Sequence, residues 1–255
     1  NLEKPNLVFG IGGYVSFPLC FTSKLFSIPL FIYENNMVLG RANRYLALFA
    51  KKILISNPNI KNISKKYQNK VNQVGSIINK NIMNSSKDES IFDNEYFTIL
   101  ILGGSQGAEV FGEIIPTVIK MIENKGYKIN INQQCTDNQK KTISDFYKKN
   151  KIKNNVLEFD KDIYKLILSS NLALTRCGAS TTAELVYSNT PFIAVPLPSS
   201  IDNHQYLNAK YYEEKGYCWL LKQEDFNIEN LFNLIIEIIK NKSKLKNTYI
   251  NMKKN

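Results

Sequence analysis

Residues 98–119 read TILILGGSQGAEVFGEIIPTVI, and they place a glycine turn between two apolar patterns. Before the turn, residues 99–102 form a continuous apolar run that is typical of a buried strand. After the turn, Ile114, Ile115, Val118 and Ile119 recur at three- and four-residue spacing, which predicts an amphipathic helix. A strand, a glycine turn and a helix in this order predict one unit of a parallel sheet.

The same alternation of short apolar runs and helix-period stretches continues along the chain. It predicts an α/β fold in which helices cover both faces of parallel sheets and ligands bind beyond the carboxyl ends of the strands. The predicted strands lie near Leu7–Phe9, Leu30–Tyr33, Ile53–Ser56, Thr98–Leu102, Ile129–Gln133, Val156–Phe159, Leu172–Thr175, Phe192–Val195 and Cys218–Leu221.

A polar segment from Asn79 to Glu95 is typical of a hinge between two such sheets. We therefore expect residues 1–85 to form a first domain and residues 92–240 a second. The end of the chain, residues 241–255, reads as a helix that packs back on the first domain. Because the chain starts with Asn1 and enters a core strand almost at once, we expect further sequence before it and an incomplete first domain.

Composition limits the function only coarsely. The 255 residues are 44% hydrophobic and 22% charged, as in ordinary globular proteins. The net charge of +11 suggests an anionic partner, such as a nucleic acid, a phosphorylated substrate or an acidic membrane, but a lysine-rich solvated surface explains it equally well.

Four scattered cysteines without a CxxC pair argue against a zinc site and a disulfide scaffold, and they favour a reducing compartment. No apolar run is long enough to span a bilayer, so any membrane contact is expected to be peripheral.

Three glycine elements follow predicted strands. Gly10–Tyr14 suits close approach of a phosphate to the backbone, although a tight packing turn explains it as well. In Gly103–Ala108, Ser105 and Gln106 have the hydroxyl and amide to contact phosphate and sugar, and the spacing is neither that of a Walker loop nor of the dinucleotide fingerprint. In Arg176–Glu184, the Glu184 carboxylate suits a ribose diol, while Thr181 and Glu184 also have the spacing of a capping box.

Two polar stretches complete the candidate site. Residues 202–209, DNHQYLNA, offer amides and an imidazole to a hexose, while Asp202 suits a helix cap. His204 is the only histidine, so a hydrolase triad would have to use it, and a site with several histidine ligands is not possible. A structural role is the default interpretation of a lone histidine. Asn36, after a predicted strand, suits either ligand contact or a helix cap.

In this order the elements resemble the MurG family of N-acetylglucosaminyltransferases of cell-wall synthesis, over nearly the whole chain. The most specific matches are GGYVSFP at 12–18, YENNMVLGRANR at 33–44, LGGSQGA at 102–108, RCGASTTAEL at 176–185 and PLPSSIDNHQYLNA at 196–209. The resemblance implies a GT-B fold of two Rossmann-like domains, the first incomplete here. It implies an inverting transfer of N-acetylglucosamine from UDP to the C4 hydroxyl of the lipid-linked muramyl-pentapeptide, with no metal and no cofactor.

The resemblance also implies site residues. Gly12, Gly13 and Tyr14 would bind the acceptor diphosphate. The donor UDP-N-acetylglucosamine would be bound by residues of both domains, namely Asn36, Ser105, Gln106, Ala179, Ser180, Thr181, Thr182, Ala183, Glu184 and Gln205. The family's candidate base is a histidine in an earlier glycine loop, which is expected upstream of Asn1. No catalytic base is therefore assigned, and this stretch alone is expected to be inactive.

Several positions depart from the family pattern. Tyr33 replaces a histidine, Asn35 a glutamine, and Glu109 an arginine, while Asn79 stands where an arginine contacts the donor phosphate. The apolar residue near the uracil falls around Phe159 and Asp160. Two alternatives remain, another GT-B enzyme that glycosylates a lipid and a nonenzymatic nucleotide-sugar-binding protein, and the stretch from Gly12 to Pro18 argues against the first.

For its surroundings, the resemblance implies a peripheral position at the cytoplasmic face of the bacterial inner membrane. The implied partners are the two substrates, an anionic membrane surface and cell-wall synthesis proteins, with no nucleic acid. Phe17, Leu19, Phe21, Leu25 and Phe26, with Lys24, suit an apolar patch beside a basic charge. We expect most of these apolar residues to be core and one or two to reach the surface.

Overall fold

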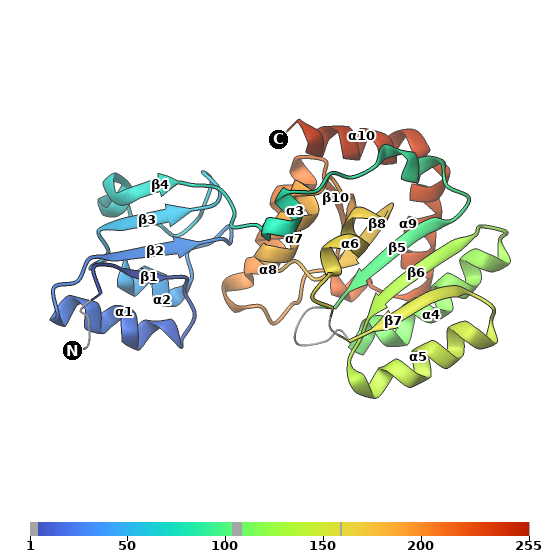
Figure 1. The fold of residues 1–255 in the computed structure, drawn as a ribbon, viewed down its shortest axis with the longest axis horizontal. Coiled ribbons are helices and arrows are strands. Elements are labelled where there is room, and N and C mark those ends of the chain that lie inside the picture. Colours follow the sequence, from blue (N-terminus) through green and yellow to red (C-terminus); the bar gives the residue numbers. More distant parts are fainter. Residues whose placement is uncertain (1–4, 104–108, 159, 255) are drawn as a thin grey trace. The chain divides into compact units, whose positions relative to one another are not determined.

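The computed structural model describes residues 5–103, 109–158 and 160–254, and it divides into two compact units (Figure 1). The first unit contains the chain up to Ile77 together with Ser200–Asn208. The second contains Ile78–Ser199 and the chain from Ala209 onward. The boundary thus lies at Ile77, eight residues before the expected end of the first domain at residue 85, and a short later segment joins the first unit.

The first unit is built on a four-stranded parallel sheet of order β1-β2-β3-β4. Its core is apolar on the face covered by α1 and α2, where Cys20 and Leu46 pack against Ile32 and Ile53. Its elements are β1 (Val8–Gly10), α1 (Ser16–Leu25), β2 (Leu30–Glu34), α2 (Arg41–Leu46), β3 (Lys52–Ile55), η1 (Lys65–Lys70), β4 (Val71–Gln73) and η3 (Ile201–Asn203).

The second unit has a six-stranded parallel sheet of order β10-β9-β8-β5-β6-β7. The chain runs outward from β5 in one direction and then from β8 in the other, so the order reverses between these two neighbouring strands. Its strands are β5 (Phe97–Leu102), β6 (Ile129–Gln134), β7 (Lys153–Leu157), β8 (Leu172–Thr175), β9 (Phe192–Ala194) and β10 (Cys218–Leu220). Such a reversal is where ligands bind in open α/β sheets.

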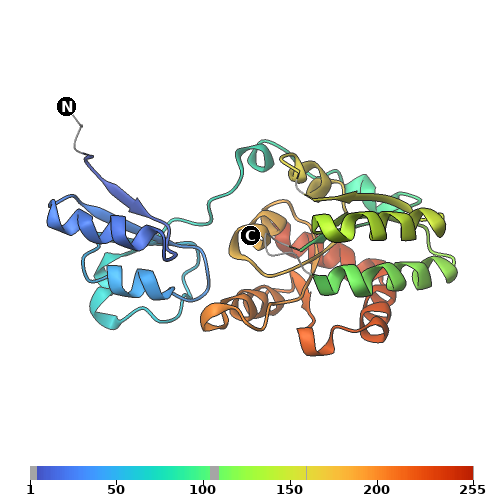
Figure 2. The same ribbon diagram turned by 90° about the horizontal axis from the view of Figure 1, so that it is seen from below.

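Helices cover both faces of this second sheet. Its helical segments are α3 (Lys80–Met83), η2 (Glu89–Asp93), α4 (Glu109–Asn124), α5 (Asp137–Lys149), α6 (Ile163–Leu168), α7 (Ala179–Tyr187), η4 (Gln223–Asp225), α9 (Ile228–Lys240) and α10 (Lys242–Lys253), while α8 (His204–Glu214) contributes to both units. Figure 2 shows α4 and α5 side by side on one face.

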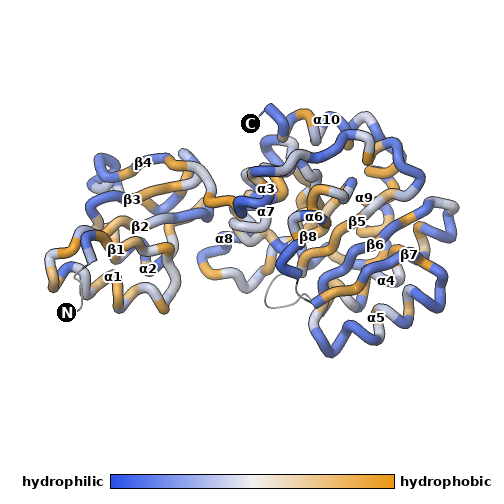
Figure 3. Tube along the Cα trace, viewed as in Figure 1, coloured by the Kyte–Doolittle hydropathy of each residue, from blue (hydrophilic) through white to orange (hydrophobic). Residues whose placement is uncertain are grey.

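The alternation of side chains along β5 explains the two layers of core. Ile99 and Ile101 face the cluster that includes α4 and α9, whereas Leu100 and Leu102 face the cluster that includes α7. Successive residues of a strand point to opposite faces, so a fully apolar strand is needed when both faces are covered. The hydrophobic colouring of β5 in Figure 3 matches this position.

Residues 79–95 and the last helix, α10, were expected to connect the two domains, and both pack within the second unit. Residues 79–95, expected to be a hinge, contain α3 and η2, and Ile82 and Phe92 are buried. The last helix, α10, was expected to pack back on the first domain, but it belongs to the second unit. There Tyr249 packs edge-on against Phe92 at 5.5 Å between ring centroids and donates to Glu89 at 3.1 Å.

Candidate functional site

A pocket of about 190 Å³ lies within the first unit, at the carboxyl ends of β1 and β2. Gly12 and Gly13 form one wall with φ of +83° and +81°, values that L side chains rarely adopt. Ser16, at the start of α1, donates to the carbonyl of Gly12 at 2.7 Å and holds the loop against the helix. The lining residues with functional groups are Tyr14, Glu34, Asn36, Arg41, Asn43, Asp202 and His204.

Glu34 organises the opposite wall. One of its oxygens accepts from the backbone and the side-chain amide of Asn36, at 3.1 and 2.8 Å. The other accepts from the Gly40 backbone at 2.9 Å and from Asn43 at 3.0 Å. Because the carboxylate is buried and all four contacts are donors, it fixes the turn between β2 and α2.

Asn36 is held from a second side by the segment that joins this unit late in the chain. Its Oδ1 accepts from Asn208 at 3.1 Å, while Asn208 Oδ1 accepts from the Met37 backbone at 2.9 Å. The helix that follows Asn36 begins at Arg41 with Gly40 as its N-cap. The alternative that Asn36 caps this helix is therefore wrong.

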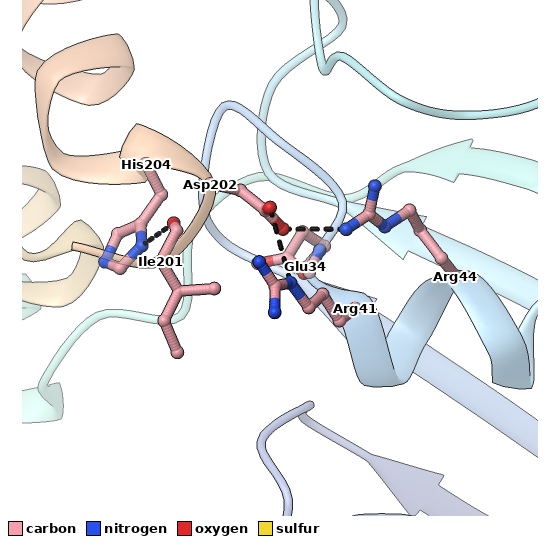
Figure 4. Close-up of polar contacts among 7 residues, drawn as sticks. Glu34, Arg41, Arg44, Ile201, Asp202 and His204 are labelled. Atoms are coloured by element: carbon pink, nitrogen blue, oxygen red, sulfur yellow. Dashed lines mark hydrogen bonds and ion pairs between the residues drawn. The ribbon is translucent and has the colours of Figure 1, made fainter. Parts of the chain in front are cut away.

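Asp202 does not cap a helix either. Its carboxylate meets Arg44 at 2.7 Å and Arg41 at 3.4 Å, so both arginines of α2 converge on it (Figure 4). Asp202 has φ of +52°, a left-handed conformation that Asp tolerates better than most residues. The capping interpretation for Asp202 is thus wrong, and its two ion pairs tie α2 to the turn at 201–203.

His204 contacts the same turn. Its Nδ1 lies 2.8 Å from the carbonyl oxygen of Ile201, which favours the tautomer with the proton on Nδ1. His204 is among the residues that line the pocket, and Figure 4 shows its ring beside Ile201. This arrangement agrees with a structural role for His204.

A second group of candidate residues lies in the second unit, where α7 begins next to the reversal between β5 and β8. Gly178 is the N-cap and provides no side-chain cap, so the first N–H groups of α7 have no capping side chain. Thr181 is inside the helix, so the capping-box explanation for Thr181 and Glu184 is wrong. Thr182 instead bonds back to the carbonyl of Gly178 at 3.0 Å and is buried.

Glu184 is half-buried on α7, and this burial raises the pKa of its carboxyl above the ordinary glutamate value. A hydrogen bond from the backbone of Asn79 opposes that rise. Asn79 itself caps α3, since its side chain accepts from the Asn81 backbone at 2.9 Å. The position where the family pattern has an arginine therefore lies beside Glu184.

Comparison with known proteins then decides the family. Residues 98–255 match the glycosyltransferase family 28 C-terminal domain and residues 2–55 match its N-terminal domain. The N-acetylglucosamine transferases acting on N-acetylmuramyl-(pentapeptide) pyrophosphoryl-undecaprenol from Pelagibacter ubique and Rickettsia canadensis are 35% and 38% identical. The alignments cover 99% and 98% of this chain and 69% and 72% of those proteins. The chain belongs to the MurG family.

A solved MurG structure has the same fold as this chain. The crystal structure of Acinetobacter baumannii MurG superposes with a TM-score of 0.79 at 27% identity, over 98% of this chain and 70% of that one. The expected α/β architecture, a GT-B glycosyltransferase fold with parallel sheets, is thereby confirmed.

The two units divide the predicted MurG-family site residues between them. Gly12, Gly13, Tyr14 and Asn36 line the pocket of the first unit, and Gln205 belongs to the same unit. Residues 179–184 form the start of α7 in the second unit. Ser105, Gln106 and Phe159 lie outside the described residues, while Asp160 accepts from the Asp162 backbone at 2.8 Å.

The predicted position of the catalytic base also falls outside the described residues. The structure describes the chain from Pro5 onward, and the glycine loop of the family was expected upstream of Asn1. Nothing in the described structure tests that expectation. The location of the base therefore stays a prediction.

Sequence reasoning missed two parts of this pocket. Asn43 is fully buried and donates to both Glu34 and the Tyr33 carbonyl, but its own Oδ1 has no hydrogen-bond partner. The pairing of Arg41 and Arg44 with Asp202 was also not predicted. The three-residue spacing of the arginines on one helix was visible, but their partner lies about 160 residues away in the sequence.

The expectation that most apolar residues of α1 are core is wrong. Leu19, Leu25 and Phe26 are 68%, 70% and 62% exposed, and Phe21 is exposed as well. Lys24 stands among them, over the ring of Phe49 at 4.2 Å. Within the described residues, no helix is long and apolar enough to cross a membrane.

Proposed function

We propose that this protein transfers N-acetylglucosamine from UDP to the C4 hydroxyl of undecaprenyl-pyrophosphoryl-MurNAc-pentapeptide, with inversion at the anomeric carbon. The observation that supports this most directly is the 35–38% identity, over nearly the whole chain, to enzymes whose names state that transfer. The reaction converts one lipid-linked cell-wall precursor into the next.

The nucleotide part of the donor is assigned to the second unit. A diphosphate suits the start of α7, because uncapped backbone N–H groups and the positive end of the helix dipole favour anions there. Glu184 lies about one and a half turns further along and is assigned to the ribose hydroxyls, from which an ionised carboxylate accepts hydrogen bonds. Ser105 and Gln106 are assigned to the same donor.

The acceptor diphosphate is assigned to the pocket of the first unit, beside Gly12, Gly13 and Tyr14. Neither glycine carries a side chain, so a phosphate can approach the backbone closely there. Asn36, fixed between Glu34 and Asn208, and Gln205 are assigned to the donor sugar. Fixed amides suit a hexose, whose hydroxyls both donate and accept.

Catalysis by this arrangement depends on positioning and on stabilising the leaving diphosphate. Glu34 is unsuited to be the general base, because both of its oxygens already accept two hydrogen bonds each.

The exposed apolar residues of α1 support a peripheral position on the cytoplasmic face of the inner membrane. Leu19, Leu25 and Phe26 are exposed hydrophobic side chains, and Lys24 adds a positive charge next to them in the sequence. An apolar surface with basic residues binds anionic lipid surfaces. Cell-wall synthesis proteins are the further partners that this position would allow.

The test combines titration and turnover in the full-length protein. Calorimetric titration with UDP-N-acetylglucosamine, UDP-glucose and UDP should show preference for the N-acetyl sugar, and transfer should occur to the lipid-linked muramyl-pentapeptide but not to diacylglycerol. Transfer to diacylglycerol would favour a different GT-B enzyme. Binding without any turnover would favour a nucleotide-sugar-binding protein, and absence of binding would overturn the assignment.

A further inference from the structure

Arg41 is held only loosely at the pocket of the first unit. Its side chain is 58% exposed, and its Nε lies 3.4 Å from Asp202 Oδ1. An exposed ion pair of this kind contributes little to stability. A multiply charged anion in the pocket therefore has little to displace.

Both carboxylates of the pocket have partners other than Arg41. Glu34 accepts from four N–H groups, and Asp202 also pairs with Arg44 at 2.7 Å. Among the described residues that line the pocket, Arg41 is the only arginine or lysine. Arg41 is thus the one lining side chain with a full positive charge to offer.

The space beside Gly13 is open, whereas Gly12 packs against Asn43. A side-chain carbon added at Gly13 would meet no atom within 4 Å, and Tyr14 is 70% exposed. The guanidinium is planar and matches two phosphate oxygens at once, while backbone N–H groups near Gly12 and Gly13 suit the remaining oxygens. A diphosphate ester combines the charge and the length that this pocket can meet.

We propose that Arg41 exchanges Asp202 for a diphosphate bound beside Gly12 and Gly13, while Arg44 retains Asp202. Asp202 then holds the Arg41 side chain at the pocket until the ligand binds. One part of this inference rests on the proposed function, namely the assignment of the diphosphate to the lipid-linked acceptor and not to UDP-N-acetylglucosamine.

Pyrophosphate is the probe that separates binding from turnover. By calorimetry on the full-length protein, Arg41→Ala should weaken pyrophosphate binding about tenfold, as expected for one charge-assisted contact. Asp202→Asn should bind pyrophosphate more tightly than the wild type, because the competing carboxylate is gone. Lys65→Ala, which removes an exposed charge from η1, should bind as the wild type does.

Equal affinity in Arg41→Ala and the wild type would overturn the proposal, as would an equal loss in Lys65→Ala. Circular dichroism on each variant confirms folding before titration.

Kinetics then identify the source of the diphosphate. In the full-length enzyme, Arg41→Ala should raise the KM for the lipid-linked acceptor about tenfold and leave the KM for UDP-N-acetylglucosamine within about twofold. A rise confined to the UDP-N-acetylglucosamine KM would overturn the acceptor assignment. A wild-type enzyme without transferase activity would sink the proposed function, whereas the pyrophosphate titration would still decide the role of Arg41.

Discussion

The side-chain amide of Asn43 donates to the Glu34 carboxylate over 3.0 Å and to the Tyr33 carbonyl over the same distance, so a buried amide on α2 fixes the end of β2. Glu34→Gln replaces one acceptor oxygen by an NH₂ group and leaves two donors without a partner. We expect the variant to lose about 2–6 kcal/mol of unfolding free energy, since each of the two stranded buried donors costs about 1–3 kcal/mol.

Urea unfolding followed by circular dichroism measures this loss. Glu113→Gln, at an exposed position of α4, is the matched control and should change the free energy by less than about 0.5 kcal/mol. If Glu34→Gln and Glu113→Gln unfold at the same urea concentration, the network around Glu34 does not stabilise the first unit.

Glu184→Ala should weaken UDP-N-acetylglucosamine binding by about 1–3 kcal/mol, because a charged hydrogen-bond acceptor is lost. Calorimetry on the full-length protein measures it, with Glu229→Ala on the exposed side of α9 as the control. Unchanged donor affinity in a folded Glu184→Ala protein would leave Glu184 without a ligand role, since its helix-capping role is already excluded.

Burial raises the Glu184 pKa, and this gives donor binding a pH dependence with a definite sign. The ionised form accepts hydrogen bonds from the ribose hydroxyls, so wild-type affinity should fall as pH decreases, beginning above the ordinary glutamate range. Glu184→Gln should bind more weakly at neutral pH and show no such fall. A parallel fall in both proteins as the solution is acidified would assign the titration to another group.

The sequence predicted the fold well because most strands are buried on both faces. The apolar runs of β5, β8 and β9 have no helical periodicity and are bounded by turn residues, so they were predictable. Of the four edge strands, β1 and β10 were predicted, but β4 and β7 were not predicted correctly. β4 reads Val71-Asn72-Gln73 and was missed, and β7 begins at the polar residues Lys153 and Asn154, so it was placed too late.

The pocket was harder to predict than the fold. The glycine loop is local in sequence and was identified from its pattern, but Asp202 meets Arg41 and Arg44 only through tertiary structure. The exposure of α1 was misjudged for a related reason. Apolar residues at Leu19 and Leu25 suit a core by composition alone, and only the packing of the helix shows which side faces the sheet.

The exposed side of α1 should bind anionic membranes. Replacing both Leu19 and Leu25 by Ser should weaken binding of the full-length protein to phosphatidylglycerol-containing vesicles at least about tenfold, because a buried leucine contributes about 1.5–3 kcal/mol. Vesicle co-sedimentation measures it. Ile250→Ser, an exposed apolar residue of α10, is the control. Equal sedimentation of all three proteins would place the membrane contact elsewhere.

Lys87 should make the stability of the second unit depend on pH. Its buried Nζ donates to the carbonyl oxygens of Ile167 and Ser170 and to Thr190 Oγ1 at 2.9 Å, and burial lowers its pKa to about 7. In the unfolded chain this lysine titrates near its ordinary pKa of 10.5, so between these values only the unfolded state binds the proton. Stability therefore rises with pH, by up to about 1.4 kcal/mol per unit.

Lys87→Met removes this titration and leaves the acceptors unpaired. The variant should be less stable, and its deficit relative to the wild type should grow between about pH 7 and 9. Trp219, the only tryptophan, lies in β10 and makes fluorescence-detected urea unfolding report on the second unit. Lys125→Met, at an exposed position, should track the wild type at both pH values. A deficit that is the same at both pH values would show that Lys87 remains charged in the folded protein, with its three oxygen partners outweighing the cost of burial.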